Sequence, residues 1–271
     1  MSQTLAALAT RFHALHADGL LRLPNAWDAG SARLAQAAGA RAIATSSAAV
    51  AWAHGWPDGD LLPVELLLRT TAAVAAATDL PVTIDIEGGY SDEPARVGEL
   101  VAALLEAGAV GINLEDGSKD PALLCAKIAA ARAAGDRAGV PLFVNARIDV
   151  WLRGLAPAGE RVGETLARAA RYRAAGASGL FAPGITDAGE IAALVAGTDL
   201  PVNVLAWSGL PAADRLQALG VRRLSAGSAI AEAMHGHVLA LMRRFVETGR
   251  IDDADARPAT YGEVQALMAR R

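Results

Sequence analysis

The chain has one cysteine, Cys125, only two lysines and few aromatic side chains. One thiol cannot build the disulfide framework of a small secreted protein, so a reducing cytoplasm is the expected compartment. No run of 18 apolar residues is free of charge, Gly or Pro, so we expect no membrane span. Residues 1–19 lack a basic segment ahead of an apolar one, and they are typical of an amphipathic helix rather than a signal peptide.

An excess of positive charge is also missing. The net charge is −4, which provides no basic field for nucleic acid or anionic lipid, and we expect neither as a partner. Hydrophobic residues make up 53% of the 271 residues, enough for one sizeable core. A (β/α)8 barrel typically takes about 250 residues, so the length fits one such domain.

Short apolar runs alternate with Ala- and Leu-rich helical stretches along the chain. Near-continuous apolar runs are typical of parallel strands that are buried on both faces. Eight such runs without a linker predict an α/β fold, a single (β/α)8 TIM-type barrel over residues 1–271. The predicted strands are Leu21–Pro24, Ala42–Ser46, Val82–Glu87, Gly111–Glu115, Leu142–Asp149, Gly179–Ala182, Val202–Ala206 and Arg223–Ala226.

Two helical features and a tail accompany the strands. Apolar residues at helical spacing from Val97 to Leu105 predict one core-facing stripe. Asp187 followed by Glu190 predicts a capping box. Residues 252–271 form a C-terminal extension with a further helix near Tyr261–Arg270, which is either a surface cap or a helix exchanged with a partner subunit.

Carboxylates stand at the ends of neighbouring predicted strands, where such barrels place their active sites. Asp85 and Glu87 are two residues apart and would share one face of a strand, and Glu115 ends the next strand, about 4.8 Å away. Oxygen ligands without a thiolate or imidazole favour a hard cation, so we predict Mg²⁺, with Mn²⁺ as a substitute. The alternative is that these acids pair with nearby arginines at the surface.

Arg147 lies within an apolar run, where an unpaired guanidinium would be costly. It would hold a substrate carboxylate with two parallel hydrogen bonds. An ion pair with Asp149 or Glu115 is the alternative, and both interpretations can hold together.

Further polar residues follow other predicted strands. Ser46 and Ser47 could donate to an anion or an enolate oxygen. Asp58 lies in a Trp/Pro/Gly loop that could cover the barrel mouth, whereas His54 is most simply an ordinary loop histidine. Asn25 would line the pocket or cap a helix. Asn203 would bind substrate or make a hydrogen bond within the barrel.

Four segments together resemble the isocitrate lyase/phosphoenolpyruvate mutase superfamily: TSSAAVAWAHGWPDGD, DIEGGYSD, GINLEDG and NARIDVWL. The resemblance covers nearly the whole chain and implies a Mg²⁺-dependent barrel that makes or breaks C–C or P–C bonds beside an α-keto acid. It implies metal-associated roles for Asp85, Glu87 and Glu115, anion contacts for Ser46 and Ser47, and catalytic or substrate-binding roles for Asp58 and Arg147. It also implies a homodimer or homotetramer. Position 87 is Glu where many relatives have Asp.

The departures from that family narrow the reaction. The lyases' Lys-Lys/Arg-Cys-Gly-His loop is missing, and Cys125 falls in a helical run where packing is the simpler role. The long gating loop of the mutase is missing too, which disfavours phosphoryl migration because that step needs a dry site. The sequence therefore resembles the short-loop branch of the superfamily.

These observations predict an enzyme that breaks a C–C bond of a small, oxaloacetate-like α-keto acid through an enolate. Neither Lys119 nor Lys127 lies on a predicted strand, which disfavours a Schiff base and favours a divalent metal. Cleavage of a methylisocitrate-like 2-hydroxy tricarboxylate and P–C chemistry are the alternatives within the superfamily. A keto-acid-binding protein with little turnover is the alternative of another class. The LSAGS segment at Leu224–Ser228 could instead cradle a phosphate.

Overall fold

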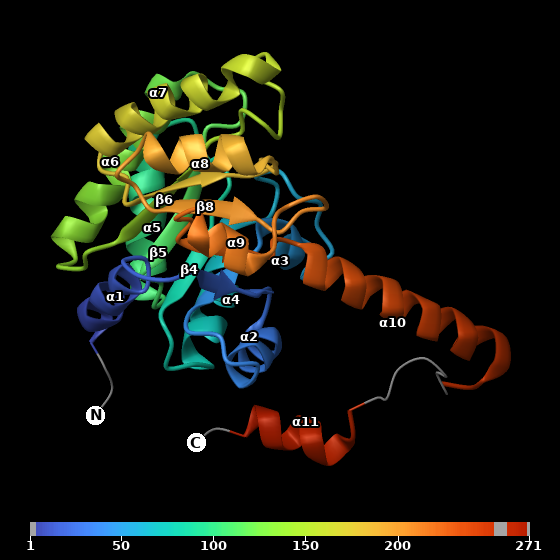
Figure 1. The fold of residues 1–271 in the computed structure, drawn as a ribbon. Coiled ribbons are helices and arrows are strands. Elements are labelled where there is room, and N and C mark those ends of the chain that lie inside the picture. The colour runs from blue at the N-terminus through green and yellow to red at the C-terminus, as the bar shows by residue number, and fades with distance from the viewer. Residues whose placement is uncertain (1–3, 252–258, 270–271) are drawn as a thin grey trace.

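The computed structural model describes residues 4–251 and 259–269, and its centre is a parallel sheet that curls into a barrel (Figure 1). The strand order is β1-β9-β8-β7-β6-β5-β4-β3-β2. The strands are β1 Leu21–Leu23, β2 Asn25–Ala26, β3 Ile43–Thr45, β4 Val82–Asp85, β5 Gly111–Glu115, β6 Phe143–Arg147, β7 Gly179–Ala182, β8 Val202–Leu205 and β9 Arg223–Ser225.

The first predicted strand is present as β1, and a further short strand, β2, lies just beyond its predicted end; together they close the barrel. Pro24 separates β1 from β2 and has no N–H to donate to a neighbouring strand. β1 pairs with β9, and β2 pairs with β3, so one extended segment joins the two edges of the sheet. All eight predicted strands are therefore found, and the predicted fold class is confirmed.

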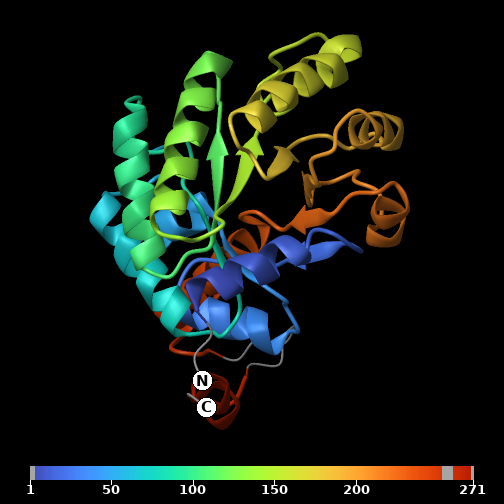
Figure 2. The same ribbon diagram turned by 90° about the vertical axis from the view of Figure 1, so that its left-hand side faces the viewer.

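Helices surround the strands, as the view in Figure 2 shows. They are α1 Leu5–Ala14, α2 Ala29–Ala37, α3 Ser47–Ala53, α4 Val64–Ala76, α5 Pro94–Glu106, α6 Pro121–Arg137, the 3-10 turn η1 Ala158–Glu160, α7 Arg161–Ala174, α8 Ala188–Ala196, α9 Ala213–Ala218, α10 Ala229–Thr248 and α11 Tyr261–Met268.

The two predicted helical features have different outcomes. The stripe on α5 is confirmed, because Val97, Leu100, Val101, Leu104 and Leu105 are all buried. Asp187 caps α8 by accepting hydrogen bonds from the backbone N–H groups of Gly189 and Glu190. The reciprocal half of the capping box was wrong, because the Glu190 carboxylate accepts a hydrogen bond from the Trp151 indole at 3.1 Å.

The end of the barrel where the strands begin is closed by aromatic side chains from α1 and the turn after it. Phe12 and the ring of His16 pack on Phe143, with ring centroids 5.2 and 4.1 Å away. Gly111 makes room for this packing, since a Cβ there would lie 2.9 Å from the Phe12 ring. Burying a large apolar side chain contributes about 1.5–3 kcal/mol, so this plug stabilises the closed end.

The middle of the barrel is polar, whereas branched aliphatic layers usually fill such barrels. Asn113 accepts hydrogen bonds from Asn145 at 2.9 Å and from Arg223 at 3.2 Å. Arg223 also donates to Ser225, which donates to Asn203. Burial lowers the pKa of Arg223 to about 10, so the guanidinium remains charged at neutral pH. This connected set is the polar layer.

His16 makes the stability of the fold sensitive to acid. Its Nδ1–H donates to the Phe12 carbonyl at 2.8 Å, and burial, with the charge of Arg223, lowers the pKa of His16 to about 3. Below pH about 6.5 the unfolded chain takes up the proton and the folded chain does not. The free energy of unfolding should therefore fall by up to about 1.4 kcal/mol per pH unit as the pH drops further.

Urea unfolding at pH 7.5, 6.5 and 5.5 would measure this loss. His16→Phe should show a shallower decline than the wild type. The same substitution at His235, which is exposed on α10, is the matched control. Equal declines in wild type and His16→Phe would contradict the assignment.

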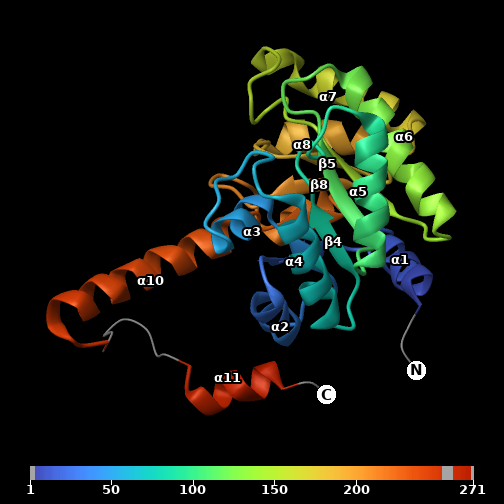
Figure 3. The same cartoon turned by 180° about the vertical axis from the view of Figure 1, so that it is seen from behind.

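The C-terminal helices lie outside the barrel. α10 projects away from it in both Figure 1 and Figure 3, and α11 lies beside α2, where Arg33 donates to the Leu267 carbonyl at 3.2 Å. The predicted helix at Tyr261–Arg270 is confirmed through Met268, while positions 252–258 and 270–271 of the predicted extension lie outside the described residues. Large exposed apolar side chains on α10 are Ile230, Leu239, Met242, Phe245 and Val246.

None of the helices in the described ranges combines the length and hydropathy that crossing a bilayer requires.

Candidate active site

The predicted site residues gather at one end of the barrel because their strands are neighbours. β3, β4, β5 and β6 are consecutive in the sheet and parallel. Asp85 ends β4, and Glu115 and Arg147 end β5 and β6 in direct register with each other. The structure therefore brings Asp85, Glu115 and Arg147 together at the carboxyl ends of the strands, where such barrels bind their ligands.

Asp85 is the central carboxylate of this group and is 9% exposed. Its Oδ1 accepts a hydrogen bond from the backbone N–H of Glu87 at 3.2 Å, and Oδ2 faces the Asn113 amide at 3.5 Å. Burial raises the pKa of Asp85, the charge of Arg147 opposes this, and the nearby Asp58 carboxylate adds to the increase. The Asp85 carboxylate thus has only two long hydrogen bonds from the described residues, which leaves it available to a cation.

Glu87 does not share a strand face with Asp85, so that expectation was wrong. β4 ends at Asp85, and Glu87 lies beyond it with φ of +50°, in the left-handed region. Its Oε2 accepts hydrogen bonds from the backbone N–H groups of Gly59 and Asp60, and its Oε1 accepts one from the Tyr90 hydroxyl. Burial and neighbouring carboxylates raise the pKa of Glu87 to about 7.

Arg147 is clamped between two acids. Its Nε and Nη2 donate to the two oxygens of Asp149 at 2.7 and 3.1 Å, and its Nη1 lies 2.6 Å from Glu115 Oε2. Burial alone would lower the pKa of Arg147, but the two carboxylates outweigh it and raise it. Burial also raises the pKa of Glu115 to about 8 against the pull of Arg147. The predicted ion pairs with Asp149 and Glu115 are both confirmed.

The clamp leaves part of Arg147 available. A guanidinium has five N–H groups, and Asp149 accepts hydrogen bonds from two of them, while Glu115 makes an ion pair with Nη1. The N–H groups without a hydrogen bond are on Nη1 and Nη2, and one from each nitrogen could meet a carboxylate with two parallel hydrogen bonds. The Arg147 side chain is 16% exposed, so it is not fully enclosed by its two partners.

Asp116 holds the backbone of Asp149, the acid that pairs with Arg147, and this role could not be predicted from the sequence. Its carboxylate accepts hydrogen bonds from the Asp149 backbone N–H at 3.0 Å, from Arg168 at 2.9 Å and from the Tyr172 hydroxyl at 2.8 Å. Arg168 and Tyr172 come from α7, more than 50 residues along the chain. The acidic pair Glu115–Asp116 was the only local signal, and it does not indicate partners that far away.

The remaining predicted residues have more varied positions. Ser46 and Ser47 are buried where β3 meets α3, and the Ser46 hydroxyl caps that helix. Asp58 lies in the exposed loop, close enough to raise the pKa of Asp85 and Glu87. His54 bonds to Thr70 at 2.8 Å, as an ordinary loop histidine would.

The two asparagines have roles within the barrel. Asn25 donates to the Thr45 carbonyl at 2.7 Å and accepts from the Gly227 N–H at 2.9 Å, so both ends of its amide join backbone segments. Asn203 is fully buried in the polar layer and accepts from Ser225. Asn203 thus makes the predicted barrel hydrogen bond, whereas a helix cap by Asn25 was wrong, because Asp28 is the N-cap of α2. Substrate contacts by either residue stay predictions.

The donor set fits a hard cation bound mainly by water. Within residues 4–251 and 259–269, no three Asp, Glu, His or Cys side chains are grouped closely enough to surround a metal ion. Mg²⁺ usually takes one or two protein carboxylates and keeps several waters, so it does not need such a group. Burial and, after it, neighbouring carboxylates raise the pKa values of Asp85, Glu87 and Glu115, and a divalent cation beside them would lower these pKa values.

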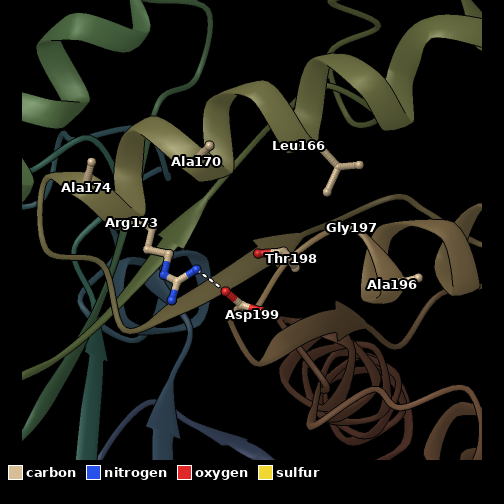
Figure 4. Close-up of a pocket in the computed structure, with 8 residues that line it drawn as sticks. All are labelled: Leu166, Ala170, Arg173, Ala174, Ala196, Gly197, Thr198 and Asp199. Carbon is tan, nitrogen blue, oxygen red and sulfur yellow. Dashed lines mark hydrogen bonds and ion pairs between the residues drawn. The ribbon is translucent and has the colours of Figure 1, made fainter.

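A hollow of about 490 Å³ between α7 and α8 is separate from this site. It is lined by the ends of the two helices and contains the ion pair of Arg173 with Asp199 (Figure 4). Both helices end there before β7 and β8 begin, so the hollow lies at the opposite end of the barrel from Asp85. It plays no part in the chemistry of the carboxylates.

Comparison with known proteins assigns this parallel barrel, with its acids and ion-paired arginine at the strand ends, to a family. The family model described as phosphoenolpyruvate phosphomutase matches residues 12–246. The chain belongs to this family, within the PEP mutase/isocitrate lyase superfamily. Enzymes of the superfamily cleave C–C or P–C bonds and use Mg²⁺.

Three relatives illustrate the range of similarity. An uncharacterized protein of Mycobacterium tuberculosis is 40% identical over 95% of each chain. The crystal structure of a proposed phosphonomutase from Burkholderia cenocepacia J2315 is 41% identical, with a TM-score of 0.84 over 89% of this chain and 99% of that one. An oxaloacetate decarboxylase of Bradyrhizobium is 32% identical over 65% of this chain and 62% of its own.

Proposed function

We propose that this chain is a Mg²⁺-dependent enzyme that breaks the C–C bond β to the carbonyl of a small, oxaloacetate-like α-keto acid. One observation carries the proposal. Asp85, with its weak protein partners, stands at neighbouring strand ends with Arg147, which has a spare pair of N–H groups. A dianionic keto acid would be bound by a cation at its carbonyl oxygen and by paired guanidinium N–H groups at its carboxylate.

The contacts of each residue suggest its role in the proposed reaction. Asp85 would hold the cation directly, and Glu87 and Glu115, whose oxygens already have protein partners, would act through water. A bound Mg²⁺ would polarise the ketone oxygen and stabilise the enolate that forms. Arg147 would bind the carboxylate, Ser46 and Ser47 would donate to the enolate oxygen, and Asp58 would face the departing fragment.

Loss of CO₂ fits the site better than release of a second acid. In the lyases a loop cysteine protonates the departing acid, and here Cys125 lies within α6, half-buried, as expected for a packed residue. CO₂ departs without taking up a proton, and the enolate left behind can take its proton at the methylene carbon from water to give pyruvate. Lys127 also has another role, because its Nζ binds the Gly88 carbonyl at 2.6 Å, and this supports the exclusion of a Schiff base. Similarity to an oxaloacetate decarboxylase agrees with this choice.

Pyruvate release from oxaloacetate, with Mg²⁺ and then with excess EDTA, tests the proposal. We expect turnover well above the rate with free Mg²⁺ alone, and its loss in EDTA. A rate equal to that background would contradict the proposal. Thermal stabilisation by oxalate and Mg²⁺ without any consumption of oxaloacetate would instead support the binding protein. Release of an acid from methylisocitrate would support the lyase.

We also propose that the chain forms a homodimer or homotetramer. α10 projects away from the barrel (Figure 3). Its exposed apolar side chains, Phe245 at 54% and Val246 at 84% among them, would be covered by a second copy. Light scattering should then give a mass of at least two chains, 27.8 kDa each, and Val246→Asp should lower it. The mass of one chain for the wild type would contradict this assembly.

A further inference from the structure

The loop that contains Asp58 is attached to the barrel by the carboxylate of Glu87. Oε2 of Glu87 accepts hydrogen bonds from the backbone N–H of Gly59 at 2.8 Å and from that of Asp60 at 2.5 Å. These are the two residues that follow Asp58. Two charge-assisted hydrogen bonds to one carboxylate oxygen fix the backbone beside Asp58 more firmly than packing of exposed side chains could.

A second set of contacts joins the same two segments. Oδ1 of Asp60 accepts a hydrogen bond from the Tyr90 backbone N–H at 3.1 Å, and the Tyr90 hydroxyl donates to Glu87. Glu87, Asp60 and Tyr90 all have φ between +50° and +58°, which costs free energy for residues with a side chain. A left-handed backbone at these residues persists only where surrounding contacts stabilise it. The hydrogen bonds between the loop and the Glu87 segment are such contacts.

Lys127 fixes the Glu87 segment from below. Its side chain is 3% exposed, and its Nζ donates to the Gly88 carbonyl at 2.6 Å and to Asp92 at 3.3 Å. A buried ammonium requires partners, and both of its partners lie in the turn that follows Glu87. These bonds connect the turn to α6, so the backbone that carries the Glu87 side chain is held in place.

The length of the Glu87 side chain matters for this attachment. An aspartate would place its carboxylate about 1.5 Å closer to the backbone, one C–C bond shorter. The distances to the Gly59 and Asp60 nitrogens would then lie well beyond hydrogen-bonding range unless the loop or the turn moved. Aspartate would keep the charge near Asp85 but would lose its hold on the loop.

We propose that Glu87 is a positioning residue that holds the Asp58 loop, residues 55–60, over the end of β4. It acts through the backbone of Gly59 and Asp60, and so it fixes the position of Asp58, the residue before them. The value of this placement for catalysis rests on the proposed function, whereas the attachment itself does not.

Amide hydrogen exchange, resolved to single residues and measured on the full chain without metal or substrate, tests the attachment. In the wild type the Gly59 and Asp60 amides should be protected. Glu87→Asp should speed their exchange at least tenfold, while Glu87→Gln, which keeps an acceptor oxygen at the same reach, should stay closer to the wild type. Glu99→Asp, the same shortening at an exposed position of α5, is the matched control.

The outcomes separate the two proposals. Unprotected Gly59 and Asp60 amides in the wild type would overturn the inference without any variant, and so would unchanged protection in Glu87→Asp. If wild-type chain turns over oxaloacetate, Glu87→Asp should lower kcat more than it raises KM. It should add little to the loss caused by Asp58→Ala, because both changes remove the same placed carboxylate. Absent turnover would contradict only the proposed function, since the exchange result does not depend on it.

Discussion

Replacing Asp85 with Asn should lower kcat/KM for oxaloacetate by about 10³-fold or more, which corresponds to about 4 kcal/mol of transition-state stabilisation. The substitution keeps the shape of the side chain and one oxygen for the Glu87 N–H, but it removes the charge that would hold the cation. Mn²⁺ binding, followed by electron paramagnetic resonance, should weaken in parallel, while the unfolding midpoint should change little.

The control for this change is Asp199→Asn. Asp199 is an exposed carboxylate paired with Arg173 in the hollow at the other end of the barrel. That variant should retain wild-type turnover and Mn²⁺ affinity. A kcat/KM for Asp85→Asn within threefold of the wild type would show that Asp85 does not bind the essential cation.

Replacing Arg147 with Met should have the second large effect, on both stability and activity. Glu115 and Asp149 would then be buried opposite one another without their shared cation, at a cost of about 3–5 kcal/mol. The fork for the substrate carboxylate would also be lost, so we expect KM for oxaloacetate to rise at least tenfold in assays below the unfolding midpoint. Arg147→Lys should recover part of the stability but little of the KM, because an ammonium cannot present paired N–H groups.

Arg153→Met is the matched control for Arg147. Arg153 also contacts Asp149, at 2.9 Å, but its side chain is 46% exposed. Its loss should cost less than about 1 kcal/mol of stability, as surface ion pairs do. If Arg147→Met left KM unchanged, the guanidinium would serve only to balance the two acids.

The sequence predicted the residues that depend on strand position and missed those that depend on distant contacts. Asp85, Glu115 and Arg147 could be placed together because parallel strands end at the same edge. The direction of Glu87 could not be predicted, since its left-handed backbone is set by bonds to Gly59, Asp60 and Tyr90. Asp116 was visible as an acid, but its partners come from α7 and its role required the fold.

Within the polar layer only Asn203 was predicted to make a barrel hydrogen bond, which it accepts from Ser225. The links among Arg223, Asn113 and Asn145 had no local signal. Arg223 was read as the first residue of an apolar strand, and its partner Asn113 is 110 residues away. The hydrophobic pattern predicts which strands are buried, but it does not say which interior position accepts a hydrogen bond from which. That information lies in the register between strands.

The polar layer also limits how this barrel can change during evolution. Aliphatic interiors tolerate many exchanges that preserve volume, because dispersion contacts have no direction. Here Asn113 accepts from both Asn145 and Arg223, and Ser225 passes the chain of bonds on to Asn203. A single exchange to an aliphatic residue would leave a further buried donor or acceptor unmatched, beside Asn145 Oδ1, Asn203 Nδ2 and Arg223 Nη1, which have no hydrogen-bond partner within the described part of the chain. Among related sequences, we therefore expect a substitution at one position of the polar layer to be accompanied by substitutions at its hydrogen-bond partners on neighbouring strands.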